Sequence, residues 1–123
     1  MSAKEISAQE AFDTVVNHLR AQKVRSLLPE GSHEPGNCAY RGENGTKCAF
    51  GPFIPDDKYT PQMEGLNVLF LIEQYDFLKP LREHVYLLSA MQEIHDNYTT
   101  LQAWERLWRQ TAQRFHLKYT PPE

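Results

Sequence analysis

The chain has 123 residues, enough for one hydrophobic core and too few to divide comfortably into two, so we expect a single domain over residues 1–123. Charged residues make up 24% and apolar residues 41% of the sequence, which excludes a fibre and a wholly disordered chain. The formal net charge of −3 argues against binding to duplex DNA by bulk charge.

The sequence shows no feature of a secreted or membrane protein. The most apolar run, from Leu66 to Ile72, contains Asn67 and is far too short to span a bilayer, and the N-terminus has no apolar core of signal-peptide length. Two cysteines are too few for a disulfide scaffold. We therefore expect free thiols, no membrane association and a cytoplasmic protein.

Residues 1–28 are predicted to hold an N-terminal helix. Ser7 and Glu10 have the spacing of a capping box, which places the start of the helix directly after Ser7. The apolar residues that follow share one helical stripe: Phe12, Val15, Val16 and Leu19. Residues 29–36 are polar and rich in proline and glycine, so a loop is expected there.

Residues 37–65 are predicted to form a β-hairpin and a loop. Glu43-Asn44-Gly45 fits a three-residue hairpin turn with glycine in the left-handed region. This register places Cys38, Tyr40, Cys48 and Phe50 on one face and Ala39, Arg41, Lys47 and Ala49 on the other. A two-residue Asn44-Gly45 turn, which would shift the register by one residue, stays open as an alternative.

After the hairpin, short turns are expected. Two prolines prevent a continuing strand, and Asp56 is placed to cap a turn that runs to Tyr59. Thr60-Pro61 has the pattern of a second helical start, which Gly65 can end.

Residues 66–117 are predicted to be helical, and residues 118–123 to be a frayed tail. A short helix capped by Asn67 comes first, and a long helix follows with Pro80 in its first turn. Thr99 and Gln102 form a second capping box before the last helix. The predicted fold class is mainly α with one β-hairpin (α+β): about four helices in a small bundle, capped by the glycine- and proline-rich hairpin and loop.

The segment 38–65 resembles a family of small proteins of bacteria and their temperate phages. Its pattern is C-x-Y-R-G-x-(N/D)-G-x-K-C-A-x-G followed by I-P-D-x-x-Y and M-E-G, and the matching residues are Cys38, Tyr40, Arg41, Gly42, Asn44, Gly45, Lys47, Cys48, Ala49, Gly51, Ile54, Pro55, Asp56, Tyr59, Met63, Glu64 and Gly65. The resemblance implies a phage or prophage accessory protein. It carries no catalytic residue over to this chain.

Metal binding is one hypothesis for the central segment. His33, Cys38 and Cys48 supply imidazole and thiolate, which suit zinc. The two cysteines are ten residues apart with no C-x-x-C, however, whereas structural zinc sites use closely paired ligands. We therefore predict buried, structural cysteines and no metal or other cofactor, with a metal site and redox chemistry as alternatives.

Anion binding is a second hypothesis. Arg41 directly opposite Lys47 calls for a negative group, because like charges opposed on one sheet face repel each other. An internal carboxylate is one answer, supplied by Glu43, Asp56, Asp57 or Glu64. The other is an anionic metabolite or nucleotide, held by six candidate residues: Tyr40, Arg41, Lys47, Asp56, Tyr59 and Glu64.

Catalysis has weaker support. Asp56, Asp57 and Glu64 could ligate a divalent metal in a hydrolase, but they occupy ordinary turn positions. Adjacent residues of a helix point about 100° apart, so we expect His95 and Asp96 not to bond to each other. His95 is predicted to be a satisfied histidine of the core.

The last helix suggests a protein interface. Trp104 and Trp108 lie one turn apart on a stripe wide enough to exceed what a small core covers, although both indoles could also fill the core. The predicted function is a non-enzymatic phage or prophage accessory protein that binds a host or defence-system protein, as in counter-defence. An anion binder and, more weakly, a metal-dependent hydrolase are the alternatives, and assembly into a homo-oligomer stays open.

Overall fold

The computed structural model describes residues 6–28 and 37–122. They form four α-helices, α1 (Ala8–Gln22), α2 (Val68–Gln74), α3 (Val85–Asn97) and α4 (Leu101–Arg114). Four 3₁₀ segments join them, η1 (Glu43–Gly45), η2 (Gly51–Phe53), η3 (Pro61–Met63) and η4 (Asp76–His84). The prediction of a mostly helical protein is confirmed. The loop expected over residues 29–36, including His33, lies outside the described residues.

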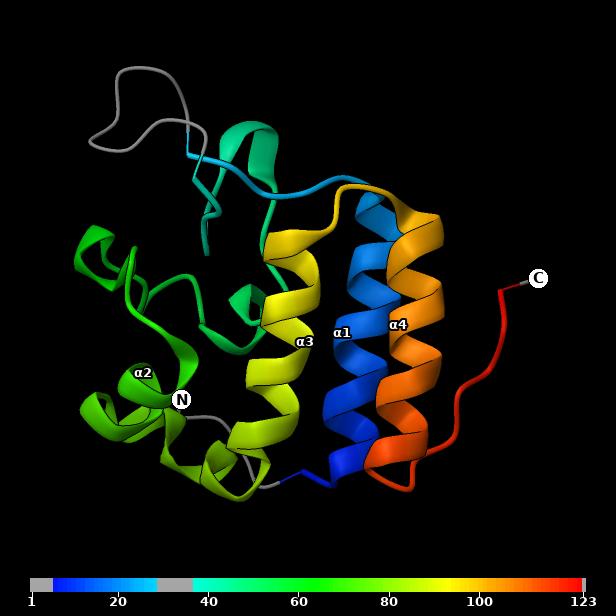
Figure 1. Ribbon diagram of the computed structural model, residues 1–123. Coiled ribbons are helices and arrows are strands. Elements are labelled where there is room, and N and C mark those ends of the chain that lie inside the picture. Colours follow the sequence, from blue (N-terminus) through cyan, green and yellow to red (C-terminus); the bar gives the residue numbers. More distant parts are fainter. Residues whose placement is uncertain (1–5, 29–36, 123) are drawn as a thin grey trace.

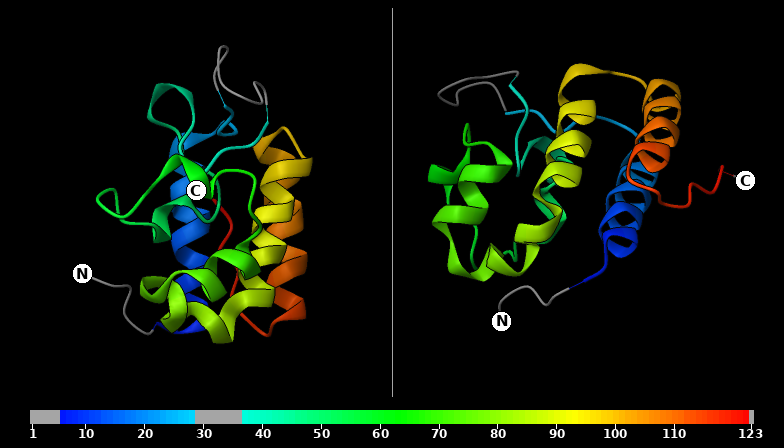
Figure 2. Two further views of the ribbon diagram at one scale, coloured as in Figure 1. Left: turned by 90° about the vertical axis from the view of Figure 1, so that its left-hand side faces the viewer. Right: turned by 60° about the horizontal axis from the view of Figure 1, so that its bottom comes forward.

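Helix α3 runs through the middle of the molecule. Helices α1 and α4 lie side by side and antiparallel on one side of it, whereas α2 and the segment 37–65 lie on the other side (Figure 1). A second direction of view shows the same order (Figure 2). The buried apolar residues form one core cluster, to which the helix pair, α3 and the loops all contribute. None of the helices in the described residues has both the length and the apolarity needed to cross a bilayer.

Local signals set the helix starts. Ser7 and Glu10 form the predicted capping box, and Lys23 in the left-handed region ends α1. The predicted cap of α2 is also confirmed, because the Asn67 side chain accepts a hydrogen bond from the Phe70 amide. The predicted apolar stripe of α1 is buried.

The first residues predicted for two helices, α3 and α4, were wrong. Pro80 lies inside η4, and the α-helix begins only at Val85. Side chains at i and i+3 are aligned in a 3₁₀ segment, and this spacing buries both Leu78 and Leu81. Helix α4 is capped by Thr100, which accepts from the Ala103 amide, and not by Thr99.

The predicted β-hairpin was wrong. The described residues contain no strand, only an isolated bridge between Leu27 and Cys38. The chain does turn at Glu43–Gly45, but both Asn44 and Gly45 have positive φ, whereas the predicted turn placed only the glycine in the left-handed region, and no ladder extends from it. The amides that a ladder would use donate to other elements: Ala39 to Ser26 O, Tyr40 and Arg41 to Glu64, Lys47 to Gln22 and Phe50 to Gln92.

The two predicted faces of the hairpin are consequently absent. Ala39 and Ala49, expected opposite the apolar face, are as buried as Cys48 and Phe50. A sheet with one solvent-facing side would keep apolar and polar residues alternating, whereas here the chain is enclosed on several sides. The segment is packed as irregular loops against α1 and α3.

Candidate functional site

Arg41 holds the loops of the segment 37–65 together. Its guanidinium donates to the main-chain oxygens of Tyr40 (3.1 Å), Gly51 (3.0 Å) and Ile54, and it also pairs with the Asp56 carboxylate at 2.9 Å. It lies over the Tyr59 ring, 5.1 Å from the ring centre. A single planar cation thus fixes three parts of the loop relative to one another.

Glu64 completes this arrangement from the other side. Its carboxylate accepts the main-chain amides of Tyr40 (2.9 Å) and Arg41 (3.1 Å) and the Tyr59 hydroxyl (2.6 Å). Burial and this bond raise the pKa of the Tyr59 hydroxyl. The Tyr40 hydroxyl donates to the main-chain oxygen of Leu66.

The positive charges of Arg41 and Lys47 meet an internal carboxylate. Asp56 lies 2.9 Å from the Arg41 guanidinium and 3.7 Å from the Lys47 ammonium. The Arg41 hydrogen bond and the Lys47 charge lower the pKa of Asp56. The six candidate anion ligands therefore contact one another and the loops, and the geometry does not favour them as a site for an added anion.

Two adjoining pockets lie beside α3, and we call them together the Asp96 groove. Their volumes are about 480 and 500 Å³, and they share Cys38, Gly65 and Asp96. The first is bounded by residues 38–40, residues 65–69 and the α3 side chains Ser89, Gln92, Glu93 and Asp96. The second continues toward Leu28 and Glu64. Sequence reasoning missed this groove, because its walls come from four separate segments: Leu28 and residues within 37–40, 61–69 and 89–96.

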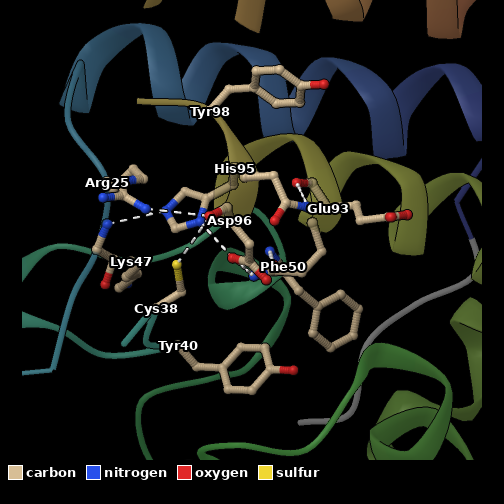
Figure 3. A network of polar contacts seen from close by, with 12 residues as sticks. Arg25, Cys38, Tyr40, Lys47, Phe50, Glu93, His95, Asp96 and Tyr98 are labelled. Atoms are coloured by element: carbon tan, nitrogen blue, oxygen red, sulfur yellow. Dashed lines mark hydrogen bonds and ion pairs between the residues drawn. The ribbon is translucent and has the colours of Figure 1, made fainter. Parts of the chain in front are cut away.

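Asp96 and His95 bond to each other, contrary to the prediction. The His95 Nδ1 lies 2.9 Å from the Asp96 carboxylate, and Nε2 accepts the Ser26 amide at 3.0 Å (Figure 3). The 100° between neighbouring helical residues describes their Cβ directions, and the outer bonds of both side chains turn the groups together. Because Nε2 is an acceptor, His95 is neutral and carries its proton on Nδ1. Its predicted burial is confirmed, with no exposed surface.

Cys38, His95 and Asp96 have the spacing of metal ligands, all within 4.8 Å of one another. Coordination through Nδ1 would require a proton on Nε2, where it would face the Ser26 amide hydrogen. Burial, and then the nearby Asp96, raise the pKa of the Cys38 thiol to about 11, which disfavours the thiolate. The arrangement therefore suits neither a metal ion nor a cysteine nucleophile.

The other predicted ligand sets are not brought together. Cys48 is fully buried in the core, and both cysteines are free thiols. Among the described residues, the Cys38 group alone has ligand spacing, and Asp56, Asp57 and Glu64 are not part of it. Asp56 is paired with Arg41, and Glu64 accepts two main-chain amides and the Tyr59 hydroxyl.

Trp104 and Trp108 lie inside the core and have no exposed surface. The large apolar side chains that do reach solvent include Leu69 and Phe70, which are 51% and 48% exposed on α2. A sequence signal for them existed. Residues 68–72 are all apolar, whereas a short surface helix can bury only one side.

Comparisons of this chain with family models, with curated proteins and with solved structures found no match. The resemblance of the segment 38–65 to small bacterial and phage proteins stays a prediction from sequence.

Mild acid is expected to destabilise the fold through His18. Its Nε2–H donates to the main-chain oxygen of Lys47 at 2.9 Å. Burial lowers the pKa of His18 below its ordinary value of 6.5, against the raising effect of this bond, and the charges of Lys47 and Arg41 lower it further. As the pH falls below 6.5, His18 of the unfolded chain takes up a proton, whereas His18 of the folded chain does so only at a lower pH. The free energy of unfolding therefore decreases in this range.

The measurement is urea denaturation from neutral to mildly acidic pH. His18→Gln keeps an amide donor for Lys47 without a titrating group, so its pH dependence should be flatter than that of the wild type. Identical slopes for the two proteins would contradict the assignment to His18.

Proposed function

We propose that this chain is a non-enzymatic accessory protein of phage or prophage type, which acts by binding a host or defence-system protein. The binding surface is the exposed side of α2 together with the Asp96 groove. The observation that carries the proposal is the half-exposed pair Leu69 and Phe70, since Leu69 also lines the groove. The phage context is supported by the sequence resemblance.

The exposed apolar side chains of this surface favour contact with a protein partner over exposure to water. One exposed apolar side chain is ordinary, but two adjacent large ones at the rim of a pocket are typical of docking surfaces. In α2, Val68, Leu71 and Ile72 already bury the side that faces the core. Leu69 and Phe70 therefore contribute little to folding and remain available to a partner.

The chemistry of the groove supports binding over catalysis. Of its titratable groups, the Cys38 thiol has a raised pKa, and the neighbouring His95 uses both ring nitrogens within the protein. A general base or nucleophile needs a free lone pair directed at the substrate. His95 offers none.

The proposal is tested with a displayed library of short random peptides, selected on the full chain. Peptides that bind the wild type should lose about tenfold or more in affinity when Leu69 and Phe70 are both changed to serine. Because both side chains are half exposed, the urea midpoint should stay close to that of the wild type.

Val24→Ser is the matched control, since Val24 is 55% exposed and lies outside α2 and the groove. It should leave peptide affinity unchanged. If no peptide is enriched, or if the enriched peptides bind the Leu69/Phe70 variant as tightly as the wild type, this surface is not the binding site.

A further inference from the structure

We infer that the Asp96 groove binds an extended peptide segment of the partner and receives one of its basic side chains, with Asp96 as the anchor. The inference rests on the proposed function and names the chemistry of the partner. Three features of the groove carry it: a main-chain edge, a partly exposed carboxylate and an apolar wall.

The first feature is the backbone of Cys38. The bridge to Leu27 is held by hydrogen bonds from Leu28 N to Asn37 O and from Ala39 N to Ser26 O. In an antiparallel pair with this pattern, the N–H and C=O of the bridged residue point away from the partner strand. The Cys38 main chain therefore points away from Leu27.

The groove lies on that outward side. Tyr40 N, two residues further on, has the same direction as Cys38 N and donates to Glu64, a residue of the groove wall. On the opposite edge, Leu27 O is already occupied by the Glu43 amide. An occupant that both donates and accepts at Cys38 is best supplied by the main chain of an extended peptide.

The second feature is the charge at Asp96. His95 Nδ1 and Gln92 Nε2 both donate to Oδ1, at 2.9 and 2.8 Å. The Cys38 thiol also lies against this carboxylate, and the Asp96 side chain is 37% exposed. Two hydrogen bonds thus fix Oδ1 in place, and the partly exposed carboxylate lines both pockets of the groove.

No lysine or arginine is found among the described residues that line the groove, whereas Glu93 lies beside Asp96 and Glu64 lies across from it. Arg25 comes nearest, but it donates to the main-chain oxygen of Asp96 at 3.2 Å (Figure 3). Arg25 also contacts the Cys38 thiol, so the three carboxylates of the groove are accompanied by a single arginine at its edge. A guanidinium or ammonium group is the complementary partner.

The third feature is the wall between this carboxylate and the exposed side of α2. Leu66, Val68 and Leu69 line it, in a pocket of about 480 Å³. The methylene stem of arginine or lysine packs along such a surface while its charged head reaches a carboxylate. Leu69 belongs to both surfaces, so an apolar residue of the same peptide would lie beside Leu69 and Phe70.

The experiment uses two small probes, the N-acetyl, N-methylamide derivatives of arginine and of citrulline. Citrulline has nearly the shape of arginine and no charge. Titration of the full chain, followed by amide NMR shifts, should show the arginine probe perturbing residues 38–40, 65–69 and 92–96. The citrulline probe should bind about tenfold more weakly.

Asp96→Asn removes the charge and keeps an oxygen for His95 and Gln92, so it should abolish the preference for arginine. Asp13→Asn on α1 is the control and should keep it. An unchanged urea midpoint shows that the Asp96 variant is folded. If that variant does not fold, Glu93→Gln replaces it and should reduce the preference for arginine in part. Equal binding of both probes, shifts outside the groove, or an unchanged preference in the Asp96 variant would overturn the inference.

The two proposals fail in different ways. Peptides that depend on Leu69 and Phe70 but show no need for a basic residue would overturn the role of Asp96 and leave the proposed function in place. Charge-dependent binding of the arginine probe in the groove, without any Leu69/Phe70-dependent peptide, would support the groove and contradict the wider surface.

Discussion

Arg41→Lys is expected to lower the free energy of unfolding by about 3 kcal/mol, although it conserves the charge. The reason is geometric. The planar guanidinium reaches the main-chain oxygens of Tyr40, Gly51 and Ile54 together, and an ammonium group has neither the span nor the orientation to do so. Gly51 O keeps the Ile54 amide as a donor, but Tyr40 O and Ile54 O lose the guanidinium in a partly buried place, so water replaces the lost bonds poorly.

Urea denaturation measures this loss, and Asp56→Asn is the matched control. Asp56 contributes the ion pair of Arg41 but is largely exposed, so its loss should move the midpoint only slightly. If the Asp56 variant lost as much stability as the Arg41 variant, the ion pair and not the carbonyl contacts would hold the loops.

Trp104→Ala should lower the free energy of unfolding by about 3–5 kcal/mol, as is usual when a buried indole is deleted. The Trp104 ring lies between His95, at 5.8 Å, and Trp108, at 6.0 Å between ring centres. Its Nε1 donates to the main-chain oxygen of Tyr98 at 2.8 Å. Deleting it removes packing between α3 and α4 and a hydrogen bond to the connection between them.

Phenylalanine at the two tryptophan positions separates these contributions. Trp104→Phe leaves Tyr98 O without its donor, whereas the Trp108 Nε1 is buried and has no partner among the described residues. Trp108→Phe removes an unsatisfied N–H and should be less destabilising than Trp104→Phe. The free energies of unfolding of the variants, measured by thermal or urea denaturation, test this order. The opposite order, or a loss below about 1 kcal/mol for Trp104→Ala, would show that the core tolerates the change.

Local sequence patterns predicted the structure around some residues of the Asp96 groove but not the groove itself. Asn67 and Gly65 were placed from sequence, one as the cap of α2 and the other at the end of a turn, and both lie at its wall. Neither prediction indicates which residues form the opposite wall of the groove. Cys38 and Asp96 are 58 residues apart and meet only because the loops fold back onto α3.

The sequence by itself determined what is decided within a few residues. Ser7 with Glu10, and Asn67 with the Phe70 amide, act across three residues, so these two capping patterns located their helix starts, whereas the Thr99 pattern missed the start of α4 by one residue. The burial of His95 also followed from its place on an apolar stripe.

Only the tertiary structure decided where the main chain of the segment 37–65 finds its hydrogen bonds. A hairpin is favoured locally when strands have no better partners, but here Glu64, Gln22 and Gln92 supply acceptors from other elements. The same holds for His95, whose tautomer is set by the Ser26 amide, 69 residues away. Such contacts depend on how distant segments pack, and no short-range pattern encodes the packing.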